Sequence, residues 1–129
     1  MSEVHLLPEN LQRKSLSRNE IVLPYADALQ ALAILEEAHW VVLGWEPWLK
    51  CPNGSHLHPL LGDSFEREDG EDWVTYVQRS ARHYREVLKD EQSHWDHGTF
   101  PDHDPSLVLY FCLTATNKEG WNDLESGCQ

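Results

Sequence analysis

Hydrophobic residues recur every three to four positions in two stretches of the chain, and both stretches predict α-helices. Residues 25–38 follow this spacing, alanine is frequent among them, and Pro24 stands close to the expected first helical position. Residues 71–91 show the same period, with acidic residues near the start and basic ones toward the end, as the helix dipole favours. The buried stripe of this second helix is expected to comprise Trp73, Val77, Ser80, Tyr84 and Leu88.

Two other segments are rich in β-branched and aromatic residues and predict strands. The first, residues 40–49, is interrupted by Gly44 and Pro47. We expect a bend or bulge at Gly44, and a sheet edge or irregularity at Pro47, which has no N–H to donate. The second, residues 106–116, is a nearly continuous apolar run, which is typical of a central strand.

A hairpin and two loosely ordered ends complete the expected domain. The sequence Cys51-Pro52-Asn53-Gly54 predicts a three-residue hairpin turn followed by a short strand at residues 55–58. Residues 1–20 lack a sustained period and are expected to form an N-terminal arm of partial order, and residues 117–129 a mobile tail. The prediction is a single α+β domain over residues 1–129, with a small sheet, a hairpin plus a central strand, covered by two main helices.

Charge narrows the classes of partner. The 129 residues include 10 Lys and Arg against 22 Asp and Glu, which gives a net charge of −12 with neutral histidines. Such a chain has no general attraction to phosphates or anionic lipid, so we expect neither nucleic acid nor a membrane as partner. A basic protein would instead be steered toward it, by a factor of about 10 to 10³ in association rate. Because no apolar run approaches about 20 residues and no signal peptide is evident, we expect a cytoplasmic location.

Much of the negative charge lies in one ten-residue segment, which we name the acidic segment (residues 63–72). Arg67 is the only basic residue in it. The sequence predicts a solvated acidic loop with ordinary carboxylate pKa values. Its carboxylates are Asp63, Glu66, Glu68, Asp69, Glu71 and Asp72.

Histidines provide the best candidates for metal ligands. His56 and His58 lie two apart on the expected hairpin strand, and residues 93–105 form a loop rich in histidine and aspartate. Together they could ligate zinc or another transition metal. Because the chain has no HExxH or CxxC motif, we expect a solvated loop without a metal. The histidines and aspartates of this loop are His94, His97, His103, Asp96, Asp102 and Asp104.

No catalytic or cofactor-binding motif stands out. The cysteines Cys51, Cys112 and Cys128 are far apart and odd in number, so we expect reduced thiols rather than disulfides or a thiolate zinc site. A GxSxG nucleophile motif and a glycine-rich phosphate loop are both missing from the sequence. The sequence therefore predicts no catalytic residue, no metal and no cofactor.

Tryptophan is frequent for a chain of this length. Trp40 and Trp73 follow the apolar patterns and are expected in the core. Trp45 and Trp48 flank the bend near Pro47, with Glu46 between them. Exposed tryptophans beside carboxylates are typical of protein recognition, because aromatic side chains dominate binding energy and charge guides the approach.

Two segments stand out: residues 42–48 (VLGWEPW), which follow the first helix, and residues 73–81 (WVTYVQRSA) in the second helix. Both resemble segments of bacterial immunity proteins, which neutralise secreted polymorphic or contact-dependent toxins. With the elements around them they cover about half the chain. The resemblance implies a small cytosolic α+β inhibitor that binds a cognate toxin, often a nuclease, and blocks its active site.

The leading hypothesis is a non-enzymatic immunity protein that occludes the active site of a basic toxin domain. Its expected toxin-binding residues are Trp45, Glu46, Trp48 and the acidic segment carboxylates Asp63, Glu66, Glu68, Asp69, Glu71 and Asp72. One alternative is a small metal-dependent enzyme that uses His56, His58 and the loop histidines. Another is a nucleic-acid-mimicking regulator of a nuclease. The oligomeric state and the reaction of the toxin are left open.

Overall fold

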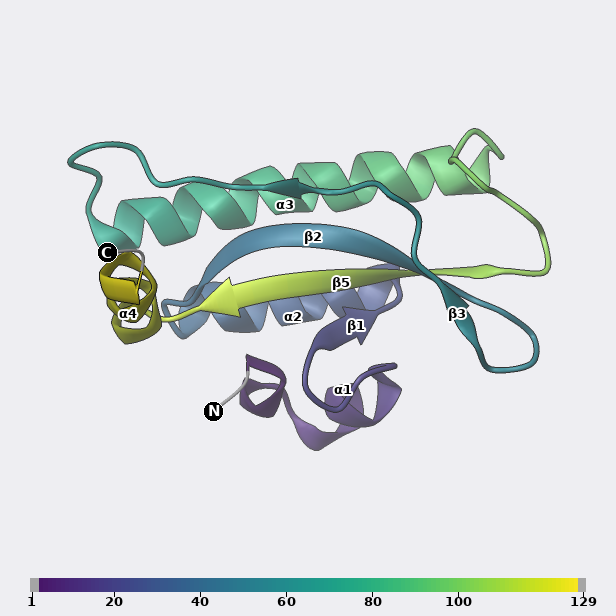
Figure 1. The fold of residues 1–129 in the computed structure, drawn as a ribbon, viewed down its shortest axis with the longest axis horizontal. Coiled ribbons are helices and arrows are strands. Elements are labelled where there is room, and N and C mark those ends of the chain that lie inside the picture. The colour runs from purple at the N-terminus through teal and green to yellow at the C-terminus, as the bar shows by residue number, and fades with distance from the viewer. Residues whose placement is uncertain (1–2, 128–129) are drawn as a thin grey trace.

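One antiparallel sheet organises the fold, as the computed structural model in Figure 1 shows for residues 3–127. The sheet order is β1-β5-β2-β3, and the short strand β4 pairs with β2 on the same side as β3. The prediction of an α+β fold with a small sheet is confirmed. Its strands are β1 (Ile21–Leu23), β2 (Val41–Lys50), β3 (His56–Leu57), β4 (Asp63–Ser64) and β5 (Val108–Thr116).

Two long helices, α2 (Tyr25–Glu37) and α3 (Trp73–Asp96), pack against each other and against one face of the sheet. In Figure 1, α2 lies behind β2 and β5, and no helix lies in front of these strands. Alternate residues of β5 enter this core, namely Leu109, Phe111, Leu113 and Ala115. Both helix predictions are confirmed, although α3 continues to Asp96 and so includes the start of the expected His/Asp loop.

The predicted stripe of α3 is buried at all five positions, from Trp73 to Leu88. The helix begins after Asp72, whose side chain accepts a hydrogen bond from the Thr75 backbone N–H at 2.7 Å. Within the stripe, the Ser80 hydroxyl donates to the Val42 carbonyl at 2.5 Å. This bond ties α3 to the most irregular part of β2.

The bulge expected at Gly44 is confirmed by a register shift between Val42 and Gly44 in the β2–β5 ladder. A Cβ atom on Gly44 would lie 2.7 Å from the Asp63 carbonyl oxygen, so the close approach of β4 to β2 requires glycine at this position. Pro47 pairs with Phe111 of β5, but its other side faces the gap between β4 and β3. The expectation of an irregularity at Pro47 therefore also holds.

The hairpin turn forms as the sequence predicts. The Cys51 N–H donates to the Ser55 carbonyl at 2.8 Å, and the Gly54 N–H donates to the Cys51 carbonyl at 2.9 Å. Gly54 has a φ of +90°, a conformation that glycine adopts readily. The strand that follows, β3, has two residues rather than the expected four.

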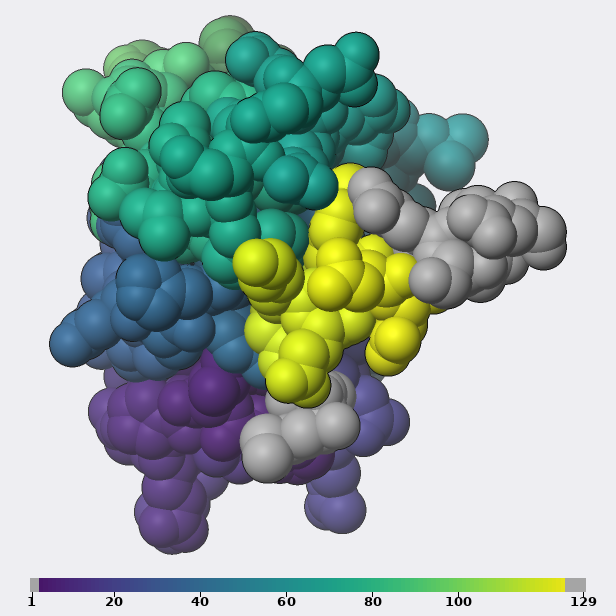
Figure 2. Space-filling view, turned by 90° about the vertical axis from the view of Figure 1, so that its left-hand side faces the viewer, coloured from purple at the N-terminus to yellow at the C-terminus, as the bar shows by residue number. Residues whose placement is uncertain are grey.

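The two chain ends are more structured than expected. The expected N-terminal arm contains the 3-10 helix η1 (Glu3–Leu6) and helix α1 (Glu9–Lys14), and Val4, Leu7 and Leu11 along it are buried against the domain. Helix α4 (Lys118–Gly127) replaces most of the expected mobile tail, and residues 128–129 lie outside the described part of the chain. Figure 2 shows α4 in yellow on the end of the molecule that faces the viewer. Across residues 3–127, no helix combines the length and the apolar character needed to cross a membrane.

Candidate partner-binding surface

The sheet face opposite the helices carries large aromatic side chains. Along β2, Leu49 enters the core, and Glu46 and Trp48 alternate onto the opposite face. Trp48 lies directly across from Tyr110 of β5, and both side chains are half-buried. Glu46 is exposed next to them. We name Glu46, Trp48 and Tyr110 the open sheet face.

Two histidines extend the open sheet face at the hairpin. The Trp48 ring centroid lies 4.9 Å from that of His56 and 4.4 Å from that of His58. The Trp48 indole N–H is shielded from solvent and has no hydrogen-bond partner within residues 3–127. Within the described residues, Trp48 is therefore held by ring contacts rather than by a side-chain hydrogen bond.

Trp45, which the sequence placed in the toxin-binding set, is part of the core. Its side chain is 6% exposed, and its ring lies 5.5 Å from that of Phe111. The reason is strand geometry: residues three apart point to opposite faces of a sheet, so Trp45 and Trp48 cannot share one surface. Glu46 and Trp48, which are two apart, do share it.

The acidic segment crosses the edge of β2 as β4 and then runs along α3, as Figure 1 shows. Asp63 is partly engaged within the fold. One of its carboxylate oxygens accepts a hydrogen bond from the Tyr84 hydroxyl at 3.0 Å, and the other lies 3.6 Å from Nε2 of His83. Burial together with this carboxylate raises the pKa of Tyr84, so its hydroxyl remains a donor.

Glu71 corrects the expectation of a uniformly solvated acidic segment. Its side chain is 5% exposed and holds Arg79 through two hydrogen bonds, at 2.7 Å to Nε and 2.8 Å to Nη2. One of its carboxylate oxygens also accepts the Glu68 backbone N–H at 3.1 Å. The Arg79 guanidinium lowers the pKa of Glu71 to about 2. Glu71 is therefore a structural group and is not free to contact a partner.

Asp72 also has a structural role, as the cap of α3. Hydrogen bonds from Thr75 hold the pKa of its exposed carboxyl below the usual range. The remaining carboxylates, Glu66, Glu68 and Asp69, are exposed, and we name them the outer carboxylates. Of these three, Glu68 lies 3.9 Å from Arg79, and no ion pair within residues 3–127 involves Glu66 or Asp69.

The structure does not bring the outer carboxylates together with Trp48. β4 pairs with Gly44 and Trp45, and from there the chain runs toward the start of α3. The start of α3 lies beside the beginning of β2, because the Trp73 indole N–H donates to the His39 carbonyl. Trp48 lies toward the opposite end of β2, near β3. The expected toxin-binding set thus divides into two separate patches.

The histidine-rich segments are used locally. His94 Nδ1 lies 3.0 Å from the Thr99 hydroxyl, and His103 packs on Trp95 with ring centroids 4.6 Å apart. In the described part of the chain, no group of three or more His, Cys, Asp or Glu side chains could hold a metal ion. Cys112 is buried, and burial raises the pKa of its thiol, so it remains protonated.

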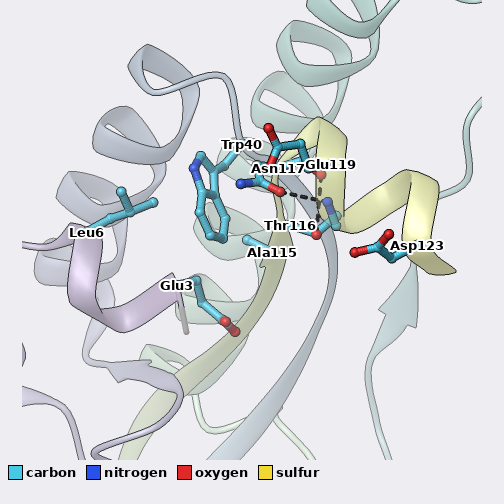
Figure 3. A pocket seen from close by; sticks show the side chains of 9 residues that line it. Glu3, Leu6, Trp40, Ala115, Thr116, Asn117, Glu119 and Asp123 are labelled. Atoms are coloured by element: carbon cyan, nitrogen blue, oxygen red, sulfur yellow. Dashed lines mark hydrogen bonds between the residues drawn. The ribbon is translucent and has the colours of Figure 1, made fainter. Parts of the chain in front are cut away.

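A cavity of about 500 Å³ was not expected from the sequence. It lies where η1, the end of β5 and the start of α4 meet, and Figure 3 shows it from close by. Its residues come from three distant stretches of the chain, none with a recognisable motif, so no local sequence signal could have found it. They are Glu3, Leu6, Trp40, Ala115, Thr116, Asn117, Glu119, Gly120 and Asp123.

Comparison with known proteins leaves the function to be argued from this chain alone. No family model matches the chain, and no match is found among curated proteins or solved structures. The resemblance to immunity proteins accordingly rests on residues 42–48 and 73–81 only.

Proposed function

We propose that this chain is a non-enzymatic immunity protein that binds a basic toxin domain and covers its active site. The observation that carries the proposal is the open sheet face, where Trp48 and Tyr110 lie side by side with no helix over them. Tryptophan and tyrosine are the residues most enriched among those that dominate binding energy at protein interfaces.

The proposed binding mode uses a preformed surface. Trp48 and Tyr110 project from paired strands of a sheet whose other face is packed against α2 and α3, so little conformational entropy is lost on binding. Glu46, exposed beside them, supplies a carboxylate for a lysine or arginine of the toxin. A standard interface buries about 800 Å² per partner, about a tenth of the 7543 Å² surface of this chain.

Charge supports a basic partner. The net charge of −12 produces a field that attracts cationic surfaces before contact is made. The outer carboxylates contribute to this field although they lie away from Trp48. We therefore propose that binding energy arises at the open sheet face and that the acidic segment mainly raises the association rate.

The test is co-purification with the toxin-bearing protein that the proposal expects to be encoded beside this chain, followed by an assay of toxin activity. Trp48→Ala, shown by circular dichroism to remain folded, should weaken neutralisation by about 30-fold or more, as expected for a central aromatic contact. Val74→Ala is the matched control, because Val74 is 48% exposed on α3. It should leave neutralisation unchanged.

Three outcomes would contradict the proposal, each at a different level. If the wild-type chain neither binds nor inhibits the toxin domain, the immunity function is wrong. Competition for the toxin by duplex DNA, with Trp48→Ala as potent as wild type, would instead favour the nucleic-acid-mimicking regulator. Full potency of Trp48→Ala without such competition would move the binding site away from the open sheet face.

A further inference from the structure

The cavity between η1, β5 and α4 combines an aromatic wall with carboxylates. Figure 3 shows the Trp40 indole extending into the space above Glu3, with Leu6 on one side and Asn117 on the other. Trp40 is half-buried and packs against the main core. Leu6 and Ala115 add apolar surface to the same cavity. The volume, about 500 Å³, is within the range of small-ligand sites.

Three carboxylates line this cavity from two separate elements. Glu3 belongs to η1, and Glu119 and Asp123 lie four residues apart on α4, which places them on one face of that helix. No ion pair within residues 3–127 involves any of the three. The cavity therefore holds several negative groups whose charge no described cation offsets.

We propose that this cavity binds a cationic group on an apolar stem, either an alkylammonium or an alkylguanidinium. The face of a tryptophan attracts such a cation, and the attraction strengthens when the site is partly shielded from water. The carboxylates of Glu3 and Asp123 supply Coulombic attraction from two sides. The stem of the ligand would lie on Leu6 and Ala115.

The environment of Glu3 supports this assignment. Burial raises the pKa of Glu3, which means that its charged form is disfavoured in the unliganded cavity. A bound cation would oppose that effect by stabilising the carboxylate. Glu119 is less informative, because an acidic residue in the first turn of α4 is already favoured by the helix dipole. Glu3 and Asp123 are therefore the residues to test.

The same chemistry has two sources. A free amine could enter the cavity, or a lysine or arginine side chain of a partner protein could insert into it. The second source rests on the proposed function, whereas the first does not. The experiments below separate the two.

The first experiment follows the indole N–H resonances of the ¹⁵N-labelled protein by NMR while butylammonium is added, with butanol as the neutral control. Trp40→Phe identifies the Trp40 resonance by its loss. We expect a saturable shift of this resonance with butylammonium, with a dissociation constant of about 1 mM or weaker for so small a ligand, and no saturable shift with butanol.

Matched variants tell the cavity apart from general attraction to an acidic protein. Glu3→Gln combined with Asp123→Asn should weaken butylammonium binding at least tenfold. Glu86→Gln combined with Asp90→Asn removes the same charge from two exposed residues of α3. This control should change the affinity for butylammonium less than twofold. The proposal is overturned if the Trp40 resonance shows no saturable shift, or if both double variants weaken binding equally.

The second experiment identifies the source. The Glu3/Asp123 double variant and the Glu86/Asp90 control are titrated against the toxin domain. A tenfold loss of toxin affinity in the first variant alone would identify a basic side chain of the partner as the occupant. Unchanged toxin affinity in this variant would identify a free amine as the occupant of the cavity. If no toxin binds the wild-type chain, the proposed immunity function is wrong. The butylammonium experiment still tests the cavity, because it uses no toxin.

Discussion

The pair formed by Glu71 and Arg79 allows a quantitative prediction for Glu71→Gln. This change keeps the shape of the side chain but removes the charge that holds the guanidinium at 2.7 and 2.8 Å. It leaves Arg79, which is 28% exposed and stacks 4.3 Å from the Phe65 ring centroid, with only the exposed carboxylate of Glu68, at 3.9 Å, as an ion-pair partner among the described residues. We expect a lower free energy of unfolding and an unchanged fold.

The magnitude follows from the pKa. Glu71 titrates near 4.5 when unfolded and at about 2 when folded. One pKa unit corresponds to about 1.36 kcal/mol, so this difference stabilises the folded state by at most about 3.4 kcal/mol at neutral pH. Water reaches Arg79 and screens the pair, so we expect a loss of about 2 kcal/mol in Glu71→Gln. Because the folded pKa is depressed, this contribution is complete above pH 4.5 and is lost as the pH falls toward 2.

Urea denaturation of the wild type and Glu71→Gln at pH 7 and at pH 3 is the assay. The variant should lose about 2 kcal/mol at pH 7, and less than half of that difference should remain at pH 3. Glu66→Gln, which removes an exposed carboxylate nearby, is the control and should change stability by less than about 0.5 kcal/mol. A loss below about 0.5 kcal/mol in Glu71→Gln at pH 7, or an equal loss at both pH values, would refute the reasoning.

Three further predictions concern other parts of the fold. Trp73→Ala should cost about 3 to 5 kcal/mol in denaturant melts, because Trp73 is 9% exposed and its indole N–H bonds the His39 carbonyl; a cost below about 1 kcal/mol would contradict this burial. His39→Gly should relieve the strain of a φ of +62° and stabilise the folded state by about 0.5 to 1 kcal/mol, which raises the unfolding midpoint. A lower midpoint would argue against strain at this position. Changing Glu66, Glu68 and Asp69 to amides should lower the association rate with the toxin and flatten the salt dependence of that rate, while the dissociation rate changes little. In stopped-flow measurements at two ionic strengths, a faster dissociation with an unchanged association rate would instead mean that these residues form the contact.

Sequence periodicity was sufficient for the elements that bury a regular stripe. The stripe from Trp73 to Leu88 and the bulge at Gly44 followed from spacing and from the chemistry of single residues. Strand β1 was missed because its three residues are all buried and show no alternation. Helices η1 and α1 were missed because they are too short for a period to emerge, and their leucines pack against distant residues.

The candidate site was only partly predictable for a different reason. Composition identified aromatic and acidic residues but not the side of the sheet on which each lies. Trp45 and Trp48 were grouped although their spacing of three sends them to opposite faces. Glu71 was grouped with solvated carboxylates because its partner Arg79 lies eight residues away, beyond the range of local pattern. The cavity around Trp40 depends wholly on tertiary packing.

The gap between β3 and β4 has a consequence for how copies of this chain meet at high concentration. Between the two short strands, Glu46 to Trp48 lack a strand partner on one side of β2, and such edges commonly recruit other chains. Proline at position 47 removes a donor from the middle of this three-residue stretch, so an incoming strand would find an incomplete ladder. At the opposite edge, β1 is covered because Ser15 Oγ accepts the Val22 N–H and the Leu16 N–H donates to the Val22 carbonyl. The sheet thus resists polymerising edge to edge while its flat face stays accessible.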